Sequence, residues 1–163
     1  MRKVAVFMGS KSDEETVRPC VEILRQLGVP YVFTISSAHR TPDRTEALVR
    51  DLEAEGCGVF ICAASLAAHL AGAVAARTIR PVIGIPLSAG NLGGLDALLS
   101  TVMMPAGFPV ATVALDKTGA RNAAWLAAQI LAVEDAELAR RLLRSREDLR
   151  AEVGKNASAL ENG

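Results

Sequence analysis

The sequence has no excess of either charge, since 18 Lys and Arg residues balance 18 Asp and Glu residues over 163 positions. It also lacks a long basic run, and contacts with nucleic-acid phosphates require clustered Lys and Arg side chains. No apolar run reaches the roughly 18 residues of a membrane-spanning helix. The apolar run at the N-terminus, residues 4–8, is too short for the core of a signal peptide. These absences predict a cytoplasmic protein with neither a nucleic-acid nor a membrane partner.

Aromatic residues and cysteines are scarce as well. Aromatic side chains make up 4% of the chain, which leaves few flat surfaces for stacking a flavin or single-stranded bases. The three cysteines, Cys20, Cys57 and Cys62, are odd in number and show no Cys-x-x-Cys or Cys/His metal spacing. The chain is too short for an eight-fold α/β barrel of about 250 residues. We expect one domain over residues 1–163, in a reducing compartment.

Short apolar runs alternate with longer amphipathic segments. The runs are nearly all apolar, as expected for strands buried on both faces of a parallel sheet. Such alternation predicts an α/β fold, a three-layer α/β/α sandwich with a doubly wound parallel sheet of about five strands in flavodoxin-like order. The predicted strands are residues 4–8, 31–35, 59–62, 82–86 and 109–115.

The first predicted helix, residues 12–27, has a Ser12-x-x-Glu15 capping box and ends at Gly28. Pro19 lies inside it, so we expect this helix to start late or to bend. A second helix is predicted from Thr41 as cap and Pro42 as first helical residue. It ends at residue 56, and further helices are predicted at residues 67–77, 94–101, 120–133 and 135–152, with a loose polar tail from about residue 154.

The loops after the strands are the expected binding edge, because ligands of open parallel sheets bind outside the carboxyl ends of the strands. Residues 9–13, Gly-Ser-Lys-Ser-Asp, follow the first strand and lead into a helix. Free backbone N–H groups and two hydroxyls would suit a phosphate there, but a simple helix cap explains them equally well. The turn matches neither the dinucleotide nor the triphosphate glycine signature, which argues against those ligands.

Two further loops carry the only histidines of the chain. His39 and Arg40 follow the second strand. The imidazole of His39 can exchange protons near neutral pH, and the planar guanidinium group of Arg40 can bind anionic oxygens. A solvated surface loop is the alternative, and the placement in a loop favours function. His69 lies in an Ala-rich stretch after the third strand, and such a lone histidine is more typical of a core or interface residue. Proton shuttling by His39 on a small phosphorylated anion is therefore the indicated chemistry.

Four motifs occur in an order that resembles one family, the N5-carboxyaminoimidazole ribonucleotide mutases, the catalytic-subunit type of phosphoribosylaminoimidazole carboxylase. The resemblance covers about residues 3–140. The motifs are Gly-Ser-Lys-Ser-Asp at residues 9–13, Ser-Ala-His-Arg-Thr-Pro at 37–42, Ala-Ala-His-Leu at 67–70, and Leu-Asp-Ala-Leu-Leu-Ser at 95–100 followed by Met-Pro at 104–105.

The resemblance implies an isomerase of purine biosynthesis that forms 4-carboxy-5-aminoimidazole ribonucleotide without ATP, metal, biotin or another cofactor. It also implies a homo-octamer in which the last helix, about residues 135–152, packs on neighbouring subunits. His39 matches the proton carrier, Ser12 and Arg40 match phosphate-binding positions, and Asp13 matches a ribose-binding position. The remaining substrate-binding positions of the match are Ser10, Ser37, Ser65, His69 and Leu70, and a loop at residues 88–92 would close the pocket.

The third loop departs from the family pattern. Four positions differ from the three glycines and one proline that the family usually has, and they are Ala63, Ser65, Leu66 and Ala71. The glycines of the family let the backbone approach the base and CO2. A related group carboxylates aminoimidazole ribonucleotide directly and usually has Lys after the active histidine, whereas Arg40 and His69 here point to the mutase type. An inactive assembly protein of the same fold is the other alternative. Flavin carriers share the fold, but they need aromatic residues in the loops that hold the flavin ring. Phosphoacceptor domains also share it, but they need an Asp at the end of the third strand, where this chain has Ala residues.

Overall fold

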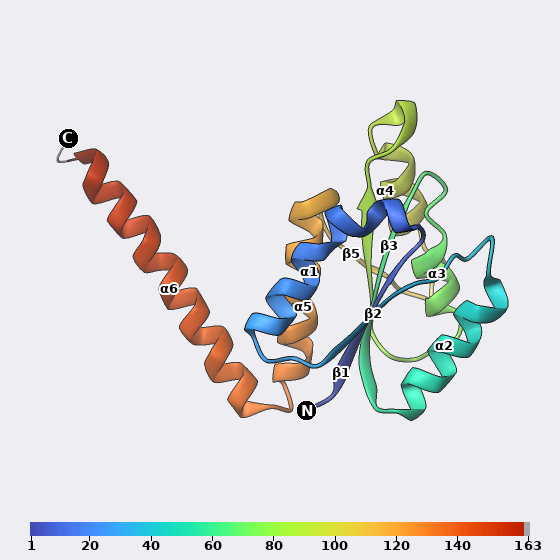
Figure 1. The fold of residues 1–163 in the computed structure, drawn as a ribbon, viewed down its shortest axis with the longest axis horizontal. Coiled ribbons are helices and arrows are strands. Elements are labelled where there is room, and N and C mark those ends of the chain that lie inside the picture. The colour runs from blue at the N-terminus through green and yellow to red at the C-terminus, as the bar shows by residue number, and fades with distance from the viewer. Residues whose placement is uncertain (162–163) are drawn as a thin grey trace.

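The computed structural model describes residues 1–161 and contains a five-stranded sheet in the order β2-β1-β3-β4-β5. Neighbouring strands are parallel throughout. Helices cover both faces of the sheet (Figure 1). The predicted flavodoxin-like α/β/α sandwich is therefore confirmed. The strands are β1 (Lys3–Met8), β2 (Tyr31–Ile35), β3 (Cys57–Ser65), β4 (Val82–Leu87) and β5 (Ala111–Thr112).

Two hydrophobic cores flank the sheet, because successive side chains of a strand point to opposite faces. On β1, Val4, Val6 and Met8 belong to one core, and Ala5 and Phe7 belong to the other. The central strands thus bury side chains on both faces, which explains why their sequences are apolar without alternation.

The helices divide between the two faces (Figure 1). α1 and α5 pack against each other over the first core, while α2, α3 and α4 lie on the opposite face. Two short 3-10 turns, η1 (Lys11–Asp13) and η2 (Gly90–Leu92), precede α1 and α4. The helices are α1 (Glu14–Gln26), α2 (Pro42–Ala54), α3 (Leu70–Ala75), α4 (Leu95–Val102), α5 (Asp116–Ala132) and α6 (Ala136–Glu161).

The start of the first helix differs from the prediction. No capping box forms, because η1 occupies the expected first turn and the Ser10 side chain accepts the Ser12 N–H. Glu15 instead forms an ion pair with Lys117 of α5. α1 begins at Glu14, two residues later than predicted, but Pro19 still lies inside the helix, so the start does not shift far enough to exclude it. Gly28 has a φ of +66° at the end of this helix, as the stop signal predicted.

Other boundaries shift for local reasons. β5 contains two residues rather than seven, because it is an edge strand that pairs only with Ile83 and Gly84 of β4. α3 starts at residue 70 rather than 67, since Leu66 has a left-handed φ of +55°. The tail predicted to be loose is helical as far as residue 161, and its last two residues lie outside the described part of the chain.

α6 leaves the body of the molecule (Figure 1). Leu138 and Leu142 are its buried residues and belong to the first core, whereas the rest of the helix carries exposed apolar side chains such as Leu149 and Val153. Within residues 1–161, no helix combines the length and hydropathy needed to cross a membrane.

Gly119→Ala should destabilise the fold strongly. A Cβ at residue 119 would lie 1.7 Å from the carbonyl oxygen of Ala114, and backbone cannot rotate away as a side chain can. We expect a loss of about 3 kcal/mol in the free energy of unfolding. Gly154→Ala on α6 is the matched control, because a Cβ there meets no atom of the chain within 4 Å; it should not lower the free energy of unfolding. Chemical denaturation of both variants measures the difference, and equal stabilities would contradict this packing.

Candidate active site

Three loops meet at the carboxyl edge of the sheet because β1 lies between β2 and β3. They carry the Gly9–Asp13 turn, the His39 loop and the His69 loop, and together they line a cavity of about 360 Å³. The predicted site residues gather here, with the exception of Ser12, which lies beside the cavity and contacts Ser10. Those lining the cavity are Ser10, Asp13, Ser37, His39, Arg40, Ser65, His69 and Leu70.

The two histidines form the centre of this cavity. His39 Nε2 lies 2.8 Å from His69 Nδ1, and the ring planes meet at 73°. One imidazole must donate and the other accept in this hydrogen bond, so a proton change at His39 alters what His69 can offer. Both side chains are exposed. The interpretation of His69 as a core residue is therefore wrong; only the pairing of β1 with both β2 and β3 brings the histidines together.

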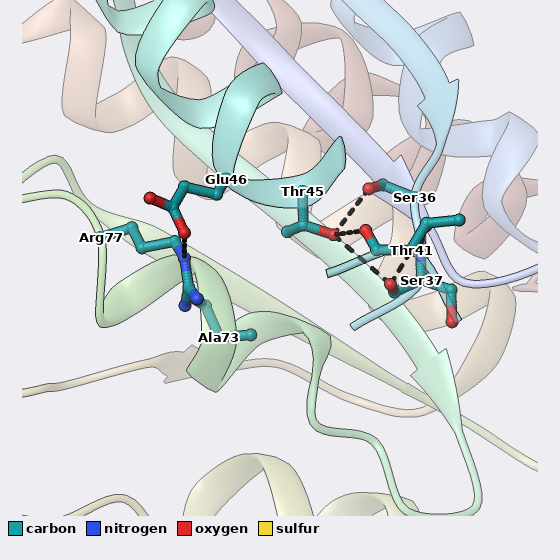
Figure 2. A network of polar contacts seen from close by, with 7 residues as sticks. All are labelled: Ser36, Ser37, Thr41, Thr45, Glu46, Ala73 and Arg77. Carbon is teal, nitrogen blue, oxygen red and sulfur yellow. Dashed lines mark hydrogen bonds and ion pairs between the residues drawn. The ribbon is translucent and has the colours of Figure 1, made fainter. Parts of the chain in front are cut away.

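A network of hydroxyl and backbone groups fixes the loop that carries His39 (Figure 2). The Ser37 N–H donates to Thr41 Oγ1 over 3.0 Å, and the Thr41 N–H donates to Ser37 O over 3.0 Å. The Arg40 N–H donates to Ser37 Oγ over 3.1 Å. Thr41 is the N-cap residue of α2 as predicted, but its side chain bonds back to Ser37 rather than capping the helix. These reciprocal bonds close a tight turn with residue 39 near its tip.

Two buried hydroxyls lie beside this turn and are hydrogen-bonded to each other (Figure 2). Ser36 Oγ and Thr45 Oγ1 share a hydrogen bond of 2.8 Å, and each residue is about 1% exposed. Thr45 Oγ1 also lies 3.2 Å from Thr41 O. A chain in which the Ser36 hydroxyl donates to Thr45, and Thr45 to the Thr41 carbonyl, satisfies both buried groups. Sequence reasoning missed this pair, because small hydroxyl residues beside a strand end have no distinctive pattern.

Arg40 connects the first two loops. Its Nη2 donates to Gly9 O over 2.9 Å. The side chain also lines a second hollow of about 830 Å³, together with Arg44 and with Lys11, which is ion-paired with Glu14 of the same hollow. Ser10 and Ser37 line both hollows, so the two adjoin. An extended ligand can therefore place an anionic end beside these cations and its other end beside the histidines.

The first turn combines hydroxyls with a half-buried carboxyl. Ser12 Oγ lies 3.0 Å from Ser10 Oγ and 3.4 Å from Asp13 Oδ1. Burial raises the pKa of the Asp13 carboxyl, while the hydrogen bond from Ser12 and the Arg40 charge partly oppose the shift. Residues 1–161 contain no cluster of three or more His, Cys, Asp or Glu side chains arranged to hold a metal ion.

Comparison with known proteins identifies the lineage of this site. A sequence model of the family described as AIR carboxylase matches residues 3–152. The chain belongs to the AIR carboxylase family. An N5-carboxyaminoimidazole ribonucleotide mutase from Saccharolobus solfataricus is 50% identical over 153 residues, covering 94% of this chain and 96% of that protein. The mutase of Escherichia coli K12 is 49% identical over 140 residues, covering 86% and 83% of the two chains.

A solved structure has the same fold. The crystal structure of Treponema denticola PurE aligns with a TM-score of 0.89 and 27% sequence identity, over 98% of this chain and 99% of that one. The alignment therefore includes the five strands and both helical layers of this chain.

The Ser36–Thr45 pair should act as one energetic unit. Ser36→Ala or Thr45→Val alone leaves a buried hydroxyl without its partner, and we expect each to cost about 1–3 kcal/mol in the free energy of unfolding. The double variant removes both groups and should lose clearly less than the two single losses added together. Thr45→Ser keeps the hydroxyl and serves as the control. Denaturant titrations that give additive losses would show that the two residues are not coupled.

Proposed function

We propose that this protein is an N5-carboxyaminoimidazole ribonucleotide mutase that forms 4-carboxy-5-aminoimidazole ribonucleotide in purine biosynthesis. The observation that carries the proposal is the His39–His69 pair, 2.8 Å apart in a cavity at the binding edge of an AIR carboxylase fold. The relatives from Saccharolobus solfataricus and Escherichia coli, which are 50% and 49% identical to this chain, are named as mutases of this kind.

The reaction moves one carboxyl group from the exocyclic nitrogen to C4, and His39 gives up one proton and receives another. The bond between the exocyclic nitrogen and the carboxyl carbon breaks, CO2 forms, and His39 gives a proton to the nitrogen. C4 of the imidazole then attacks the carbon of the same CO2, and its proton passes to His39. One imidazole thus serves first as general acid and then as general base. Because no electron or net proton is left over, the reaction requires no further reactant, and holding CO2 beside the ring supplies the necessary proximity.

The adjoining hollows accommodate the parts of a ribonucleotide. Arg40 and Ser12 bind the phosphate. Arg44 adds positive charge to that end, whereas the charge of Lys11 is offset by its ion pair with Glu14. Asp13 accepts hydrogen bonds from ribose hydroxyls, while His69 faces the base from its bond with His39. The remaining contacts come from Ser10, Ser37, Ser65 and Leu70, and the loop at residues 88–92 closes over the bound substrate.

The protein works as a cytoplasmic homo-octamer. Support comes from α6, which extends away from its own subunit with Leu143, Leu149 and Val153 exposed (Figure 1). Exposed apolar side chains along one helix are typical of a surface that packs against another chain. α6 therefore packs on neighbouring subunits and holds the assembly together.

His39→Asn should abolish turnover without unfolding the protein. The test adds fresh N5-carboxyaminoimidazole ribonucleotide to purified protein, without ATP or metal, and follows the C4-carboxylated product. Loss of a general acid–base group lowers the rate roughly 100-fold or more. Since residue 39 is exposed, the melting temperature of the variant should match that of the unsubstituted protein.

Two other results would replace the proposal. Product from aminoimidazole ribonucleotide and bicarbonate, with none from the carbamate substrate, would assign the protein to the direct carboxylases. No product from either substrate would indicate an assembly protein that keeps the fold.

The octamer is tested by light scattering coupled to size-exclusion chromatography. The expected mass corresponds to eight copies of the 17.1 kDa chain. Leu149→Glu with Val153→Glu places charges on the exposed face of α6 and should lower the assembled mass, because burying unpaired carboxylates is unfavourable. An unchanged mass in this double variant would locate the subunit interface elsewhere.

A further inference from the structure

The hollow of about 830 Å³ beside the histidine cavity, here called the phosphate hollow, contains a carboxylate among its cations. Its basic lining residues are Lys11, Arg40 and Arg44. Within residues 1–161, Glu14 is the only acidic residue that lines it. A phosphate monoester carries about two negative charges near neutral pH. The carboxylate of Glu14 therefore opposes the ligand that the neighbouring cations attract.

The two arginines of the phosphate hollow are held by uncharged oxygens. Arg40 Nη2 donates to Gly9 O over 2.9 Å. Arg44 Nε donates to Ile35 O over 3.2 Å, and its Nη2 donates to Thr34 Oγ1 over 3.3 Å. Because these acceptors carry no net charge, both guanidinium groups keep their full positive charge for a ligand.

Lys11 differs from these arginines, because its partner is the carboxylate. Lys11 Nζ donates to Glu14 Oε2, and Arg18 Nη2 donates to Glu14 Oε1. The side chain of Lys11 is 77% exposed and that of Glu14 is 20% exposed. The hydrogen bond from Lys11 lowers the pKa of the Glu14 carboxyl and outweighs the opposing effect of burial. Glu14 is thus ionised near neutral pH and cancels the charge of Lys11 within the phosphate hollow.

The position of Glu14 in the chain adds to this effect. Glu14 is the first residue of α1. The start of a helix attracts anions through its free backbone N–H groups and its dipole. The Glu14 carboxylate lies at this start itself, so it competes there with any other anion. Glu14 therefore weakens the attraction for phosphate both from Lys11 and from the helix.

We propose that Glu14 is an affinity-determining residue that limits how tightly this protein holds the phosphate of its substrate, by cancelling the charge of Lys11. The inference rests on the proposed mutase function, in which Arg40 binds that phosphate. The phosphate takes no part in the transfer of the carboxyl group, so its contacts are the same in the substrate complex and in the transition state. A change in such a contact alters KM and leaves kcat unchanged.

The test measures KM and kcat for N5-carboxyaminoimidazole ribonucleotide with charge variants of this ion pair. Glu14→Gln keeps the shape of the side chain and removes its charge. We expect it to lower KM roughly fivefold, the effect of one unit charge about 4 Å away in water, with kcat unchanged. Lys11→Met should raise KM by a similar factor. The double variant loses both charges, so its KM should return to that of the unsubstituted protein. Added salt should reduce all of these differences, because ions screen exposed charges.

Glu15→Gln is the matched control. Glu15 follows Glu14 in the chain and also forms an ion pair with a lysine, Lys117, over 2.9 Å. Neither of these two residues lines the phosphate hollow. The KM of this variant should equal that of the unsubstituted protein. Equal decreases in KM for both glutamate variants would overturn the inference, since the effect would then come from the net charge of the protein. An unchanged KM in Glu14→Gln would also overturn it.

A binding measurement separates this inference from the proposed function. Titration calorimetry with ribose 5-phosphate gives the Kd of the phosphate end without any turnover, and Glu14→Gln should bind this probe more tightly than the unsubstituted protein does. Equal Kd values would overturn the role of Glu14. Tighter binding by Glu14→Gln, together with no turnover by the unsubstituted protein, would overturn the mutase function and support the charge effect. Ribose without the phosphate should not distinguish the two proteins, and a preference for Glu14→Gln with this probe would contradict recognition of the phosphate.

Discussion

The site depends on β1 being the strand between β2 and β3. Its residues pair with both neighbours through Met8, so the three strands end side by side and their loops converge. Burial on both faces enforces this arrangement, because a one-residue slip of β1 would exchange the side chains of the two cores. His39 and His69, thirty residues apart in sequence, therefore meet through the packing of a strand to which neither belongs.

Polar groups then orient the loops whose positions the sheet determines. His39 stands on an exposed turn, which apolar packing alone cannot orient. Hydrogen bonds between Ser37 and Thr41, supported by the buried Ser36–Thr45 pair, give that turn a single shape. Arg40 links this turn to the first loop, because its side chain donates a hydrogen bond to the Gly9 carbonyl. The site thus lies at the carboxyl edge of the sheet, and hydrogen bonds between polar groups of its loops hold these loops in place.

The sheet, its order and most of the residues that line the cavity could be predicted from the sequence, because these follow from short-range patterns. Unbroken apolar runs indicate two-sided burial, and loops at strand ends indicate the binding edge. Features that depend on distant partners could not be predicted in this way. Glu15 was expected in a capping box but pairs with Lys117, and β5 shortened because it has only one neighbour. His69 resembled a core residue, since its bond to His39 depends on a contact between two loops.

The free portion of α6 has a thermodynamic consequence. Beyond Leu142 no described residue of this helix is buried, so little within its own chain adds to its backbone hydrogen bonds. Isolated helices of this kind are marginal in water. In the proposed octamer, association therefore sets the helical content of this segment, and through mass action that content varies with the concentration of the protein. The sheet and its two cores carry no such dependence, because their side chains are buried within one chain.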